Sequence, residues 1–117
     1  MDLRIRNVVN GSASAPEHAI LDVANDTFTQ FFGLADTSYR GADKVSNKLR
    51  HFFWMPTKKV HKGDVIFVWT GVGKDNSVVV NGVNVHHFYW GLASKVWNNT
   101  GDAAVLFQIQ EWMSTKT

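Results

Sequence analysis

Short apolar runs alternate with polar residues along most of the chain, at spacings typical of β-strands. Leu3 and Ile5 alternate with Arg4 and Arg6, which predicts a first strand with one face in water. Further runs rich in Val, Ile and aromatic residues are separated by Gly, Pro, Asn or Asp, and each predicts another strand. These predicted strands cover residues 18–23, 27–34, 51–55, 65–70, the two arms of 77–90, and 103–109.

Local signals add detail to this pattern. The run at 65–70 is almost continuously apolar, so we expect it at the centre of a sheet. Asn81-Gly82 lies between two Val-rich arms and predicts a type I′ hairpin turn. Gly33 predicts a bulge or bend in the strand at 27–34, whereas residues 35–50 fit either a long loop or a short helix. About eight strands with frequent turns predict an all-β fold, either a sandwich or a barrel.

Composition narrows the class of protein. A chain of 117 residues is most simply one domain, spanning 1–117, and can bury a real core. It has no Cys, which excludes disulfides, a thiolate nucleophile and a Cys-based zinc site. The N-terminus lacks the apolar core of a secretion signal, and no stretch is long enough to predict a transmembrane segment. We expect a cytoplasmic protein if Met1 is the native start, and an extracellular or cell-surface one if a signal was removed.

The segment 97–102 combines a Trp with residues suited to a tight corner. Asn98, Asn99 and Gly101 tolerate left-handed backbone, and Asp102 can accept hydrogen bonds from amides in the turn. We expect Trp97 to pack on the core side of this corner. The segment therefore predicts a structural corner that leads into the last strand.

Several motifs together resemble the second half of the lamin tail domain. They are the aromatic strand ending in Pro (HFFWMP, 51–56), the Gly-led apolar strand (GDVIFVWTGVG, 63–73), and WGLASKVWNNTGDAAVLFQI (90–109). LDVAN (21–25) fits the same pattern, whereas residues 26–50 depart from it and lack the family's Gly-Trp step. The resemblance implies an immunoglobulin-like, Greek-key β-sandwich with no catalytic residues and no cofactor. In nuclear lamins such domains are associated with protein and DNA contacts, and in prokaryotes they accompany surface or secreted enzymes.

Basic residues are concentrated in one part of the chain, although the formal net charge is only +2. Seven of the twelve lie between residues 40 and 62, where Asp43 is the single acid, so this segment is the main binding candidate. Its members are Arg40, Lys44, Lys48, Arg50, Lys58, Lys59 and Lys62. Trp54, close to them in sequence, is the aromatic candidate, and Trp90 and Trp112 are further candidates for exposure.

Three interpretations of this basic segment stay open. Lysines beside aromatic rings can contact phosphates and stack on bases, which favours nucleic acid. They can also meet an acidic protein or an anionic surface. Alternatively, they form a solvated loop that keeps an edge strand from pairing with neighbours. Self-association through a sheet edge is a further expectation.

The histidines provide the alternative from another class, a small metal-dependent hydrolase. His86 and His87 are adjacent on a predicted strand, so their side chains point to opposite faces and cannot readily chelate one metal. A site would need one of them together with Asp64 or another histidine. No Ser lies in a Gly-x-Ser-x-Gly elbow, although a Ser/His/Asp triad is spatial and does not need one. We therefore expect no metal, no cofactor and no enzyme.

Overall fold

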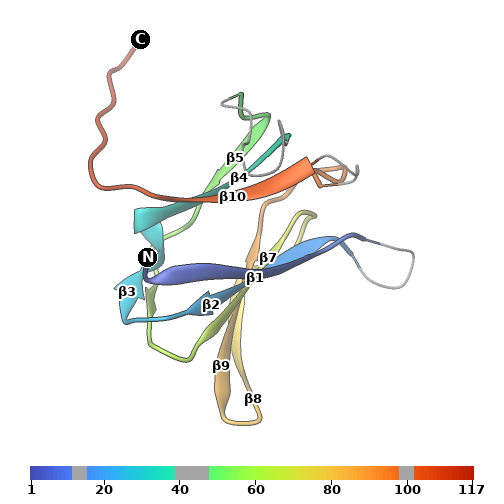
Figure 1. Cartoon of the computed structure of the whole chain (residues 1–117), viewed down its shortest axis with the longest axis vertical. Coiled ribbons are helices and arrows are strands. Elements are labelled where there is room, and N and C mark those ends of the chain that lie inside the picture. Colours follow the sequence, from blue (N-terminus) through green and yellow to red (C-terminus); the bar gives the residue numbers. More distant parts are fainter. Residues whose placement is uncertain (12–15, 39–47, 98–101) are drawn as a thin grey trace.

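The computed structural model describes residues 1–11, 16–38, 48–97 and 102–117 of the chain. These residues form an all-β fold of ten strands, with one short 3-10 turn and no α-helix in the described part (Figure 1). No helix of that part is long and apolar enough to cross a membrane. The strands are β1 (Leu3–Val9), β2 (His18–Val23), β3 (Thr27–Phe28), β4 (Phe32–Ser38), β5 (His51–Trp54), β6 (Lys59–Val60), β7 (Val65–Trp69), β8 (Asn76–Val80), β9 (Val83–Tyr89) and β10 (Asp102–Gln108).

The strands build a five-stranded mixed sheet and two smaller sheets. The larger sheet has the order β1-β2-β7-β9-β8, and the smaller ones are β10-β4-β5 and β3-β6. All pairs are antiparallel except β7 with β9, which run parallel. As predicted, β7 lies at the centre of a sheet, because it has two strands on each side.

One hydrophobic core is shared by the two larger sheets. Leu21, Ile66 and Phe88 reach it from the five-stranded sheet, and Phe32 and Leu34 reach it from the three-stranded sheet. Figure 1 shows β10, β4 and β5 lying above β1, β2 and β7. Alternate residues of β7 are buried and half-buried, so its second face points away from this core.

The β8–β9 hairpin forms as predicted. Asn81 and Gly82 both have positive φ, 50° and 79°, which is the requirement of a type I′ turn. The hairpin extends below the rest of the sheet in Figure 1. Every residue of β8 is exposed there.

Two predicted elements are wrong in their bounds. The single strand expected at 27–34 is divided by a 3-10 turn at Thr29–Phe31, because Thr29 turns inward and its backbone N–H donates to Lys58 O over 2.9 Å. The hydroxyl of Thr29 also donates to Pro56 O. The segment expected to be a loop or helix begins with strand residues, since β4 continues to Ser38 beside β10.

Candidate functional site

A surface groove lies at the end of the three-stranded sheet where the C-terminal segment departs. We call it the aromatic groove, and its volume is about 470 Å³. Its lining combines the end of β5, the 3-10 turn and the segment after β10. The lining residues are Gln30, Phe31, Trp54, Met55, Pro56, Thr57, Ile109, Gln110 and Trp112.

Hydrogen bonds hold the two Trp-bearing walls of the groove to the 3-10 turn. The indole Nε1–H of Trp54 donates to Gln30 O over 2.7 Å, although the side chain is 41% exposed. The backbone N–H of Ile109 donates to Phe31 O over 2.6 Å and directs the C-terminal segment along the groove. Trp112 then meets Trp54 edge-on, with ring centroids 4.8 Å apart. Trp54 and Trp112 therefore form an exposed aromatic pair, and hydrogen bonds to the 3-10 turn fix the segments that carry them.

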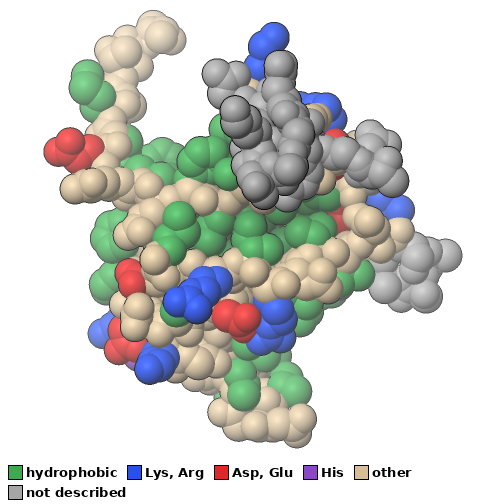
Figure 2. All heavy atoms as spheres, viewed as in Figure 1, with side chains coloured by type: hydrophobic (Ala, Val, Ile, Leu, Met, Phe, Trp, Pro, Cys, Tyr) green, Lys and Arg blue, Asp and Glu red, His purple; other side chains and the backbone are tan. Residues whose placement is uncertain are grey.

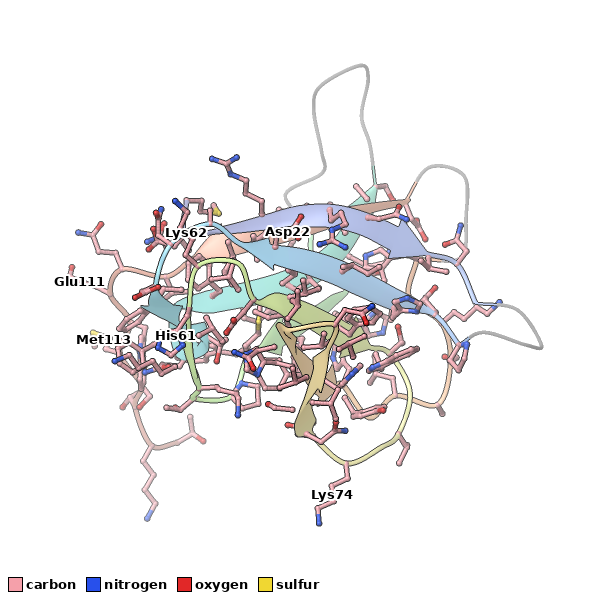
Figure 3. The ribbon with its side chains drawn as sticks, turned by 90° about the horizontal axis from the view of Figure 1, so that it is seen from below. Asp22, His61, Lys62, Lys74, Glu111 and Met113 are labelled. Carbon is pink, nitrogen blue, oxygen red and sulfur yellow. The ribbon has the colours of Figure 1, made fainter. Side chains whose placement is uncertain are left out.

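Lysines follow the groove lining along the chain, toward the β3-β6 sheet. Lys59 pairs with Phe28 in that sheet, and Phe28 meets Phe31 of the groove edge-on at 6.0 Å. Lys58 is half-buried next to Thr57 of the lining. In Figure 3, Lys62 lies on the same side of the molecule as Glu111 and Met113 of the C-terminal segment.

The remaining basic candidates do not join these lysines. Arg50 lies at the opposite end of β5, where its guanidinium donates to Ser38 Oγ over 2.6 Å and pairs with Asp102 at 3.4 Å. Lys48 is exposed two residues before Arg50. Arg40 and Lys44 lie outside the described residues. Among the described residues the predicted basic segment is therefore divided, with Lys58 and Lys59 next to residues of the groove in chain or sheet and Arg50 at the other end of β5.

The backbone just before the predicted corner is held by a carboxylate that the sequence did not single out. Trp97 is buried, and Asn98, Asn99 and Gly101 lie outside the described residues. Glu17, only 3% exposed, accepts the backbone N–H of Val96 at 2.8 Å and that of Trp97 at 3.2 Å, and also the Thr70 hydroxyl at 2.7 Å. Trp90 packs against Trp97 and does not line the groove. Its rings therefore serve the core and not a binding patch.

A second polar arrangement joins Asp64, His86 and Ser77. His86 Nε2 lies 2.9 Å from Asp64 Oδ2, and His86 Nδ1 lies 2.7 Å from Ser77 Oγ. Burial raises the pKa of Asp64, but hydrogen bonds from His86, the His61 backbone and Asn84 outweigh it, so the net pKa is lowered. Asp64 is therefore a carboxylate at neutral pH. Within the described residues, no three His, Asp or Glu side chains come together as a metal site would need.

His87 belongs to a different face of the sheet. Its Nδ1 accepts the indole N–H of Trp69 over 2.9 Å, and its ring packs against Phe67 with centroids 5.2 Å apart. Burial lowers the pKa of His87, and the charges of His86 and His18 lower it further. The two adjacent histidines thus have separate partners, as strand alternation requires.

Strand β8 is an exposed edge of the five-stranded sheet. Val78, Val79 and Val80 are exposed, and no charged residue lies between Asp75 and His86. Figure 2 shows hydrophobic side chains just above the tip of this hairpin. An uncharged exposed edge can accept a further strand, so self-association stays a prediction that sedimentation at rising concentration tests.

Comparison of the chain with known protein families, curated proteins and solved structures finds no match. The function therefore has to be argued from this chain's own residues. Sequence reasoning identified Trp54 and the lysines, but it missed Gln30, Phe31 and Ile109. For Phe31 the signal was the aromatic excess, which does not say which rings share a surface, and Gln30 and Ile109 carried no signal of their own.

Proposed function

We propose that the chain is an immunoglobulin-like β-sandwich similar to the lamin tail domain, and that it acts as a binding module through the aromatic groove and the lysines beside it. The partner we favour is a protein that presents an extended, acidic segment with an apolar anchor. Two sheets around one core support the sandwich assignment. The observation that carries the function is the exposed Trp54–Trp112 pair in the groove. Lys58 follows Thr57 of the lining in the chain, and Lys59 pairs with Phe28, whose ring meets Phe31 of the lining.

The aromatic side chains supply the anchor site. Trp112 is 65% exposed and Phe31 is 45% exposed, so both leave large apolar surface in water. Exposed aromatic rings gathered in a groove are typical of interfaces, because Trp contributes a large contact area with few rotatable bonds. An apolar side chain of the partner would bury this surface.

The lysines supply the preference for acidic sequence. Two described acids contact this segment: Asp26 accepts the backbone N–H of Lys62 over 2.8 Å, and Asp64 accepts that of His61 over 3.0 Å. Asp26 contacts the backbone of Lys62, and Asp64 is bonded to His86. Positive charge at the rim of a groove steers an acidic partner and raises its association rate. The aromatic groove and the short lysine segment fit a peptide better than a long nucleic-acid strand, which needs several phosphate contacts.

Selection from a random peptide display library tests this proposal. We expect wild-type protein to enrich peptides that combine Asp or Glu with Trp, Phe or Leu. A Trp54→Ala/Trp112→Ala variant should lose these peptides. The triple change of Lys58, Lys59 and Lys62 to Ala should weaken their binding, most strongly at low salt. Lys74→Ala is the matched control, because Figure 3 places Lys74 away from Lys62 and Glu111.

Two results would count against the proposal. Absence of enrichment, or enrichment that survives loss of both Trp side chains, would remove the groove as the site. If oligothymidylate bound instead, with affinity falling steeply as salt rises, the nucleic-acid interpretation would replace the peptide one.

A further inference from the structure

The Asp64–His86–Ser77 arrangement has the connectivity of a nucleophilic triad, although it lies outside the aromatic groove. Asp64 and His86 are buried, with 6% and 7% of their surface exposed, whereas Ser77 is exposed. The three come from separate elements: the turn before β7, strand β9 and strand β8. In the β8–β9 pairing, Ser77 lies directly opposite His86.

The proton positions along this chain follow from the geometry. The Asp64 carboxylate can only accept, so Nε2 of His86 carries the hydrogen that it donates to Asp64. In neutral His86, Nδ1 then carries a lone pair, and the Ser77 hydroxyl donates a hydrogen bond to Nδ1. A serine hydroxyl that donates to a histidine, which in turn donates to a buried carboxylate, is the arrangement that activates serine nucleophiles.

We infer that Ser77 is a nucleophile activated by His86 and positioned through Asp64, and that it takes acyl groups from small activated esters. Oγ of Ser77 forms a bond to the ester carbonyl carbon while its proton passes to Nδ1 of His86. The adduct expels the alcohol, which leaves with that proton. Water then releases the acid from acyl-Ser77 by the same proton path.

Strand β8 offers two groups that could contact an ester at Ser77. Val79 is on the same face of β8 and is 67% exposed, so it offers an apolar contact beside the hydroxyl. β8 is the edge of its sheet, so every second backbone N–H of this strand points away from β9. Such an N–H lies at Ser77 or at the next residue on either side, and it can donate to the developing oxyanion.

Labelling with a fluorophosphonate tests the inference directly. Ser77 Oγ attacks phosphorus, fluoride leaves, and the proton passes to His86, so the mass of the Ser77 peptide reports the reaction. We expect Ser77 to be labelled at least about 100-fold faster than Ser114, an exposed serine of the C-terminal segment. His86→Gln should slow labelling of Ser77 by a similar factor, and p-nitrophenyl acetate should give acetyl-Ser77 in wild-type protein only.

The wild-type comparison keeps the inference testable if His86→Gln fails to fold, because Ser77 and Ser114 react in the same molecule. Labelling of Ser77 at the rate of Ser114 would overturn the inference. Ser77→Ala leaves the aromatic groove intact, so this outcome is independent of peptide binding.

Discussion

Replacing Glu17 by Ala should destabilise the protein more than any surface substitution. The change removes a buried carboxylate that accepts two backbone N–H groups and one hydroxyl. Thr70 can rotate its hydroxyl toward another acceptor. The amides of Val96 and Trp97 cannot move in this way, because both residues are packed in the core.

The magnitude follows from these two amides. A buried donor left without an acceptor costs about 1–3 kcal/mol. We expect a total near the lower part of the summed range, about 3 kcal/mol, since water can enter the space that the carboxylate leaves. Glu17→Gln keeps one acceptor oxygen and should cost about half as much. Thr70→Val removes only the hydroxyl donor, so it should cost about 1 kcal/mol.

Urea unfolding followed by Trp fluorescence measures these differences. The predicted order of destabilisation is Glu17→Ala, then Glu17→Gln, then Thr70→Val, with an unchanged dependence on urea. A midpoint for Glu17→Ala that differs from wild type by less than that of Thr70→Val would refute the reasoning. The corner at Trp97 would then be held by contacts other than Glu17.

Three further predictions concern the sheets. Gly33→Ala should lower the free energy of unfolding by about 1 kcal/mol, because the added Cβ would lie 2.0 Å from the Phe52 ring and displace that ring from Phe107. The loss should be smaller in a Phe52→Ala background. Gly82→Ala should lower the free energy of unfolding, measured with urea, by about 1 kcal/mol, because Gly82 has a positive φ that Ala disfavours. Stability should also fall as the pH drops below 6.5, because the lowered pKa of His87 means that the unfolded chain binds more protons there.

Each of these predictions has a contradicting result. An equal cost of Gly33→Ala with and without Phe52 would show that the ring is not the obstacle. Unchanged stability in Gly82→Ala would mean that the turn adjusts to another type. A His87→Gln variant that loses stability between pH 7 and pH 5.5 as steeply as wild type would assign the pH dependence to another group.

The sequence predicted the elements whose signals are local. Asn81 and Gly82 determine the hairpin because both turn positions need positive φ, a property of those two residues alone. The central place of β7 followed from its almost unbroken apolar run. The coarse all-β class followed from many such segments together.

Elements that depend on distant contacts could not be predicted in this way. The turn at Thr29–Phe31 exists because Thr29 bonds to the backbone of Pro56 and Lys58. The parallel pairing of β7 with β9 likewise depends on which strands meet in the sheet, and no local pattern of either strand states this.

The candidate site was predicted in part for the same reason. Trp54 and the lysines near it are neighbours in sequence, so their proximity could be expected. Trp112 and Phe31 reach the groove from distant segments. Arg50 is adjacent to β5 in sequence, yet Asp102 and Ser38 hold it at the other end of the sheet.

The most direct test of the proposed function is to observe the indole N–H signals of the five Trp residues by NMR during titration with a selected acidic peptide. We predict that the signals of Trp54 and Trp112 shift in a saturable way, while those of the buried Trp97 and of Trp69 on the opposite sheet stay in place. Shifts confined to Trp69, or none at Trp54 and Trp112 while the peptide binds, would contradict the account.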